Sequence, residues 1–249
     1  MEPTDIIKTK EEILPIIKNN PVPKIVWCYW AGGPMNDNRQ RSIEMMRDYM
    51  GVPICLITNK NLQSFIVEGF PLHDTFPYLS VVHQSDYLRI YLLHHYGGCW
   101  HDVKPIMTNY NPAWKELDDQ NVYLVGKPEI KGGSAKVADK NGVWMPDHWS
   151  ELVATNRWIG RAGTPLSEEL FCDVNRFLDE NRENLKKCPA KSAYDKKNEH
   201  FWGKFIKNQY PLPWTVFGNL FHPLNYKYKQ HIQRTLPFDE KENLGLPHR

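Results

Sequence analysis

Three charged side chains lie close together in the segment "SDYLRIYLLHHYGGCWHDVKPI", residues 85–106: Asp86, Arg89 and Asp102. Asp86 and Arg89 are three residues apart, so on a helix they would lie on the same side. A carboxylate beside a guanidinium offers the acceptors and donors that sugar hydroxyl groups need. Asp102 has the chemistry to accept hydrogen bonds from a ribose or to hold a divalent cation against a diphosphate. The structural alternatives are a surface ion pair and a solvated aspartate.

Lys104 follows two residues after Asp102, where a metal-binding chain would have a second carboxylate. A hard cation such as Mn²⁺ or Mg²⁺ prefers oxygen ligands, and an ammonium group cannot be one. The ammonium group can, however, neutralise a diphosphate directly. Two arrangements therefore stay open: the lysine supplies part or all of the charge of a metal, or it points to solvent and leaves Asp102 to bind the metal.

The elements that must position these residues are a helix, a double glycine and a short strand. We expect Ser85 to cap a helix that runs to about Tyr96, with Leu88, Tyr91 and Leu92 on its core side. Gly97 and Gly98 would end this helix in the left-handed region. The following "CWHDV" is a predicted strand, which puts Asp102 near its carboxyl end. In open α/β sheets the ligand crevice lies at the carboxyl ends of the strands.

Strands and helices alternate along the rest of the chain, which predicts an α/β fold with a mostly parallel sheet. A GxGxxG dinucleotide fingerprint is absent after the first strand. The segment 152–160 indicates an edge or crossing strand, and 210–224 is aromatic and broken by prolines. The expected strands cover residues 24–30, 52–58 and 122–128, and the expected helices 5–19, 36–50, 59–69 and 165–185.

The composition restricts the class of protein. The chain has 249 residues, 41% of them hydrophobic, and a net charge of +2, which disfavours nucleic acid as the main partner. Nine tryptophans are enough to fill a core and to leave some for stacking on sugars or bases. The five cysteines form no CxxC pair, so we expect reduced thiols and a cytoplasmic protein. No stretch has the apolar length of a transmembrane helix, so any membrane contact would be peripheral.

The two motifs "PKIVWCYWAGG" and "SDYLRIYLLHHYGGCWHDVKP" resemble those of glycosyltransferases with a DXD sugar-binding region. This family includes capsular polysaccharide synthesis proteins, yeast-type α-mannosyltransferases and, more distantly, the glucosylating clostridial toxins. The likeness covers roughly residues 20–107, with weaker similarity near 154–178 and 210–224. It implies a Rossmann-like, glycosyltransferase-A type fold that uses a nucleotide sugar as its donor.

The resemblance also implies roles for individual residues. Trp30 would stack on the nucleobase, Asp86 and Arg89 would bind the donor sugar, and Trp100 would lie beside the donor. Asp102 would reach the ribose and any metal. Stacking of a base on a flat aromatic ring contributes about 1–3 kcal/mol, which makes such a role physically reasonable.

The departure from the family pattern is Lys104, which replaces the second aspartate of DXD and puts a Mn²⁺ or Mg²⁺ cofactor in doubt. If a metal is bound, the resemblance suggests His222 of "FHPL" as the second ligand beside Asp102, because a C-terminal loop closes over the diphosphate in this family. Trp214 is a further candidate for the donor pocket. Asn156 and Arg157 of "ATNRWIG" are candidates for the acceptor or sugar pocket or for a buried structural role.

The sequence therefore predicts a single glycosyltransferase domain over residues 1–249. It has an N-terminal helix (1–20), a nucleotide-sugar-binding half (21–107), an acceptor-side half (108–232) and a polar tail (233–249). The donor is expected to be UDP-linked, with GDP as second choice, the acceptor a glycan or glycoconjugate, and the anomeric configuration retained.

Two other functions stay open. One is a catalytically inactive module that binds carbohydrate or nucleotide sugar. The other is a metal-dependent hydrolase built from His94, His95, His101 and Asp102. It is the weaker of the two, because His94 and His95 are adjacent on a helix and cannot share one face.

Overall fold

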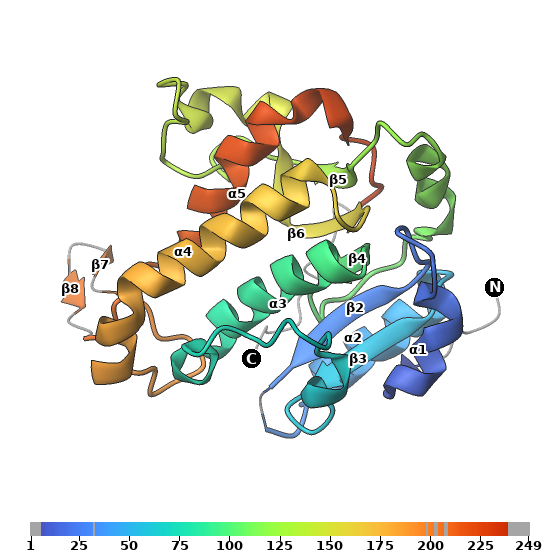
Figure 1. Cartoon of the computed structure of the whole chain (residues 1–249), viewed down its shortest axis with the longest axis horizontal. Coiled ribbons are helices and arrows are strands. Elements are labelled where there is room, and N and C mark those ends of the chain that lie inside the picture. The colour runs from blue at the N-terminus through green and yellow to red at the C-terminus, as the bar shows by residue number, and fades with distance from the viewer. Residues whose placement is uncertain (1–5, 32, 198, 202–203, 207–208, 239–249) are drawn as a thin grey trace.

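A seven-stranded sheet forms the centre of the fold in the computed structural model of the chain (Figure 1). The structure describes residues 6–31, 33–197, 199–201, 204–206 and 209–238. The strand order is β1-β3-β2-β4-β6-β5-β9, and only β6 runs antiparallel to its neighbours β4 and β5. The predicted α/β fold with a mostly parallel sheet is therefore confirmed. The strands are β1 (Ile6–Ile7), β2 (Val26–Trp30), β3 (Ile54–Thr58), β4 (Gly98–His101), β5 (Leu124–Pro128), β6 (Val153–Gly160) and β9 (Ile232–Gln233).

Helices cover both faces of this sheet (Figure 1). One face packs against α1, α3, α4 and α5, and the other against α2 and a 3₁₀ helix, η3 (Asn111–Asp118). The side chains of β2 alternate between the two faces, and both sets are buried, as expected for its continuous apolar run. The helices are α1 (Lys10–Ile17), α2 (Asp37–Tyr49), α3 (Val81–His95), α4 (Pro165–Lys187) and α5 (Val216–Lys227). A separate antiparallel pair is formed by β7 (Glu199–Phe201) and β8 (Lys204–Ile206).

The chain reverses its direction of travel across the sheet between β2 and β4. From β2 it passes through α2 to β3 on one side, and from β3 it returns through α3 to β4 on the other side of β2. The carboxyl ends of β2 and β4 therefore border a topological switch point, which is where α/β sheets open a ligand crevice. Trp30 ends β2, and Asp102 directly follows β4, so two of the predicted donor-binding residues lie at this switch point.

Several predicted elements differ from the structure at their ends. Ser80, not Ser85, caps α3, because its hydroxyl accepts a hydrogen bond from the backbone N–H of His83. The segment 152–160 is the interior strand β6, not an edge strand. The proline-broken segment at 210–224 contains most of α5, which accommodates Pro223 inside the helix. The predicted helix at 59–69 is reduced to a single 3₁₀ turn, η1 (Leu62–Phe65).

Both predicted terminal elements are described only in part. Residues 1–5 of the predicted N-terminal helix and 239–249 of the predicted polar tail lie outside the described residues. The start of the predicted helix at 5–19 is wrong, because Ile6–Ile7 form the strand β1 and α1 begins at Lys10. Among the residues that the structure does describe, no helix is both long and apolar enough to cross a membrane.

Gly97 makes the connection between α3 and β4 possible. Its φ is +71°, in the left-handed region, and an added Cβ would overlap the carbonyl oxygen of Pro21 and lie 2.9 Å from the backbone nitrogen of Ala162. The carbonyl of Gly97 also accepts a hydrogen bond from the indole N–H of the buried Trp27 at 2.7 Å. The turn that brings Asp102 to the switch point thus requires a residue without a side chain.

We expect Gly97→Ala to lower the free energy of unfolding by on the order of 3 kcal/mol, because left-handed strain and overlap with the backbone add together. Gly132→Ala is a matched control, since Gly132 has a φ of +83° but nothing within 4 Å of an added Cβ. The control should lose only the strain, about 1–2 kcal/mol. Urea denaturation of both variants measures the difference, and equal losses would show that the overlap is relieved by small backbone shifts.

Candidate active site

The guanidinium of Arg89 is the centre of the site. Its Nη2 lies 3.3 Å from Oδ1 of Asp86 on the same helix and 3.1 Å from Oδ1 of Asp102 after β4. Nζ of Lys104 lies 3.1 Å from the other oxygen of Asp102, Oδ2. The four residues, called the charged cluster below, thus form one continuous chain of ion pairs. The structure brings together all four residues for which the sequence predicts a catalytic role.

Aromatic rings enclose the same guanidinium. Its central carbon lies 5.2 Å from the centroid of Trp100 and 4.9 Å from that of Phe217 on α5. Trp100 also donates a hydrogen bond from Nε1 to Oδ1 of Asp102 at 3.0 Å. Only 5% of the Arg89 side chain is exposed, so its charge is held by the two carboxylates and the ring faces rather than by water. Trp100 therefore contacts the charged cluster and orients Asp102.

Strand β6 closes the site from the other side. Arg89 donates a hydrogen bond from Nη1 to the backbone carbonyl of Thr155. The register of β4 with β6 pairs His101 with Arg157, which puts Asn156 across from Asp102 and on the same face of the sheet. Within the described part of the chain, Oδ1 of Asn156 is a buried oxygen without a hydrogen-bond partner. Asn156 is therefore the member of the predicted pair that faces the charged cluster, while Arg157 is buried on the opposite face.

Trp30 lies at the carboxyl end of β2, on the other side of the switch point. Its indole N–H donates to the carbonyl of Gly33 at 2.7 Å, and the guanidinium carbon of Arg39 lies 5.8 Å from its ring centroid. Arg39 also donates a hydrogen bond to the carbonyl of Val103, the residue between Asp102 and Lys104. Arg39 thus connects the predicted base-stacking residue with the loop that carries the charged cluster.

His222 and Trp214 lie elsewhere. His222 is buried on α5, where Nδ1 accepts a hydrogen bond from the backbone N–H of Ala135 at 2.8 Å. Its Nε2 lies 3.3 Å from Oε2 of Glu129, although the two are not aligned as a hydrogen bond. Trp214 is 45% exposed and stacks with Lys196, whose Nζ lies 5.4 Å from the ring centroid. Neither residue has a hydrogen bond or ion pair with the charged cluster among the described residues.

The donor set of the charged cluster does not fit a divalent cation. Its two carboxylates already face the positive charges of Arg89 and Lys104, and Oδ2 of Asp102 faces the ammonium group. The described residues contain no group of three or more His, Cys, Asp or Glu side chains that could hold a metal ion. The predicted pairing of Asp102 with His222 is not formed, because His222 is directed at Glu129 and Ala135.

The three histidines of the hydrolase alternative are packing residues. His94 stacks on Phe171 with ring centroids 4.9 Å apart, and His95 lies against Tyr91 at 4.4 Å. His101 points away from the charged cluster, on the other face of β4, and burial lowers its pKa to about 3. These positions do not converge on one centre.

Burial raises the pKa of both carboxylates, but the charges around each one leave opposite net shifts. Burial raises the pKa of Asp102, but the charges of Lys104 and Arg89 outweigh it and hold the pKa well below the usual range. For Asp86 burial dominates and, with the nearby charge of Asp102, raises the pKa to about 6 despite the attraction of Arg89 and Lys104. Asp102 is thus a firmly ionised carboxylate, whereas Asp86 is one whose charge the fold disfavours.

This difference predicts a pH dependence of stability. Between about pH 4 and pH 6 the folded state binds a proton at Asp86 that the unfolded state has released, so stability should fall as pH rises through this window. We expect the free energy of unfolding of the wild type, relative to Asp86→Asn, to decrease by about 2 kcal/mol from pH 4 to pH 7. Urea titrations across this range test it, with the exposed Asp118→Asn as the surface control. A pH-independent difference would show that burial does not penalise this charge.

Two side chains of the site were not predicted from the sequence: Phe217 and Arg39. Both act across long distances in the chain, since Phe217 reaches a residue of α3 and Arg39 reaches the loop after β4. The aromatic content of residues 210–224 indicated that this segment could contribute to a site. The prolines there argued against a helix, although α5 is the element that directs Phe217 inward.

One family model matches the chain over residues 6–145, which is more than half of its 249 residues. The family is described as capsular polysaccharide synthesis protein. The matched range contains β2, α3, β4 and the whole charged cluster, but it ends before β6 and α5. A search of curated proteins found no matching relative. The chain thus belongs to the capsular polysaccharide synthesis protein family.

Proposed function

We propose that this protein is a glycosyltransferase that moves a sugar from a nucleoside-diphosphate donor, UDP-linked in the first instance, to a glycan or glycoconjugate acceptor. The observation that carries the proposal is the charged cluster at the carboxyl end of β4, beside the topological switch point. A crevice of this kind suits a nucleotide, and paired carboxylate and guanidinium groups suit sugar hydroxyls. Membership of a polysaccharide synthesis family agrees with such an activity.

Each residue of the site has a role in this proposal. Trp30 stacks on the base at the end of β2, and Asp102 accepts hydrogen bonds from the ribose. Asp86 and Arg89 bind the sugar, with Asn156 as a further acceptor for a hydroxyl group. Catalysis rests on holding the donor in position and on stabilising the departing diphosphate. The retained configuration and the glycosyltransferase-A type fold of a single domain are parts of the proposal that rest on the resemblance alone.

Lys104 supplies positive charge for the diphosphate in place of a divalent cation. Its side chain is 28% exposed, so it is partly open to solvent. Two opposite charges about 4 Å apart near a protein surface attract each other by about 4 kcal/mol before desolvation, screening and the exchange with Asp102 are counted. A carboxylate at this position would instead repel the diphosphate unless a cation lay between them.

The second candidate is an inactive module that binds nucleotide sugar without transfer. The observation that favours it is the loss of the second aspartate of the DXD pattern to Lys104. Chromatography of free UDP released from UDP-sugars, with and without a glycan acceptor, separates the two candidates. A transferase releases UDP, whereas a binding module does not.

We expect Asp102→Asn to reduce donor turnover on the order of a hundredfold or more, because an ionised group at the centre of the cluster is lost. Asp118→Asn removes an equal charge from an exposed position and should leave turnover unchanged. Isothermal titration with UDP and GDP, together with released nucleotide, gives binding and turnover separately. A folded Asp102→Asn protein with wild-type turnover would contradict the site assignment.

Metal dependence tests the role of Lys104. Wild-type turnover should persist in EDTA, and Lys104→Ala should lose on the order of a hundredfold. Lys104→Asp should become dependent on added Mn²⁺ or lose activity, while Lys115→Ala, at an exposed position, serves as the matched control. Initial rates with EDTA and with Mn²⁺ decide the matter. If EDTA abolishes wild-type activity, Mn²⁺ restores it and Lys104→Ala behaves like the wild type, the lysine does not replace the metal.

A further inference from the structure

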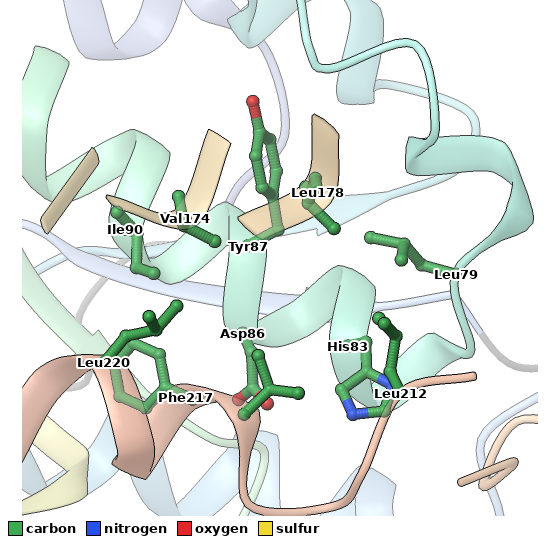
Figure 2. Close-up of a pocket in the computed structure, with 11 residues that line it drawn as sticks. Leu79, His83, Asp86, Tyr87, Ile90, Val174, Leu178, Leu212, Phe217 and Leu220 are labelled. Atoms are coloured by element: carbon green, nitrogen blue, oxygen red, sulfur yellow. The ribbon is translucent and has the colours of Figure 1, made fainter. Parts of the chain in front are cut away.

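A small cavity lies beside Asp86, whose side chain forms part of its wall. It lies between α3, α4 and α5, is partly open to solvent, and has room for about one water-sized group. Figure 2 shows the Asp86 carboxylate at this cavity, between Phe217 and His83. The walls are largely aliphatic and include Leu79, Ile90, Val174, Leu178, Leu212 and Leu220.

The other polar residues of the wall are already engaged. His83 uses Nδ1 toward the hydroxyl of Tyr210 at 2.9 Å and Nε2 toward the carbonyl of Pro213 at 3.1 Å. The hydroxyl of Tyr87 is directed away from the cavity and bonds to Asn175 at 3.3 Å (Figure 2). The Asp86 carboxylate, by contrast, has Arg89 on one oxygen and keeps capacity to accept further hydrogen bonds.

A buried donor lies beside this acceptor. Among the described residues, Nε of Arg89 is buried and has no hydrogen-bond partner, although both terminal nitrogens of the same guanidinium are engaged. Arg89 does not itself line the cavity, so the polar group that the cavity offers to a ligand is the Asp86 carboxylate. The site therefore presents a hydrogen-bond acceptor next to an aliphatic cavity.

An acetamido group has the two complementary parts. Its N–H can donate to the Asp86 carboxylate, and its methyl group can enter the aliphatic cavity. A plain sugar hydroxyl would leave the cavity unfilled. The methyl group of a 6-deoxy sugar would fill the cavity but offer no N–H to the Asp86 carboxylate.

We propose that this cavity is a subsite for the acetamido group of a 2-acetamido-2-deoxy sugar donor, an inference that rests on the proposed function. Asp86 then has two roles: it forms the ion pair with Arg89 and accepts a hydrogen bond from the amide N–H of the donor. The aliphatic wall from α4 and α5 sets the specificity for the methyl group.

The test is equilibrium binding by isothermal titration calorimetry with paired donors. UDP-N-acetylglucosamine is compared with UDP-glucose, and UDP-N-acetylgalactosamine with UDP-galactose. At least one acetamido donor should bind about tenfold or more tightly than its plain counterpart, the usual range for filling an apolar pocket. Val174→Ile adds a methyl group to the cavity wall and should remove most of this preference. Val81→Ile, at a partly buried position of α3 outside the cavity, is the matched control and should keep it.

The outcomes separate this inference from the proposed function. Equal binding of acetamido and plain donors overturns the acetamido subsite but leaves the transferase standing. Preference for a 6-deoxy donor, tested with UDP-rhamnose, also overturns the acetamido subsite while supporting donor binding. No binding of any UDP-sugar overturns both. An acetamido preference that survives Val174→Ile unchanged overturns the assignment of the methyl group to this cavity.

Discussion

The buried guanidinium of Arg89 is the interaction on which the arrangement of the site depends. A charge removed from water is tolerated only when it is paired, and losing one partner of a buried pair costs about 3–5 kcal/mol. Arg89 takes its partners from four elements of the chain: a carboxylate from α3, one from the end of β4, a carbonyl from β6 and a ring from α5. The same residue therefore fixes the relative positions of these elements and the geometry of the candidate site.

The strand order decides where this arrangement is placed. Because the chain leaves β2 in one direction and returns to β4 in the other, the helices α2 and α3 lie on opposite faces and separate at the carboxyl ends of the strands. The parallel part of the sheet supplies Trp30 and Asp102, whereas the antiparallel strand β6 supplies Thr155 and Asn156. The site is thus assembled where the two parts of the sheet join, at β4 and β6.

The local parts of the site could be predicted from the sequence, and the long-range parts could not. The spacing of Asp86 and Arg89 and the double glycine before β4 are determined within a few residues, so helix and turn rules suffice. The contact of Phe217 with Arg89 joins residues more than a hundred positions apart and depends on how α5 packs. The cap of α3 is Ser80 and not the predicted Ser85, because a serine can cap a helix at either position and only the packed structure decides between them.

His222 is a residue whose predicted role depended on tertiary packing that the sequence does not reveal. Its residue type and its place near the C-terminus made it a reasonable metal ligand, but its side chain is directed into the protein by α5 and holds the backbone of the segment after β5. Nothing in the sequence distinguishes a histidine that binds a cation from one that accepts a backbone N–H. The decisive information is the direction in which the helix presents the ring, and that direction is a property of tertiary packing.

The ion pair of Lys104 with Asp102 means that the site holds its own counter-ion before any ligand arrives. An incoming diphosphate would exchange partners with Asp102 rather than bind to an unpaired cation, and the gain in Coulomb energy would be correspondingly small. Inorganic phosphate and pyrophosphate offer nothing else to the site, so the exchange would give them little affinity. The proposed nucleotide sugar would add stacking and hydrogen bonds to this exchange. The ion pair would then make the site selective, because the donor would bind more tightly than the small anions that are abundant in cells.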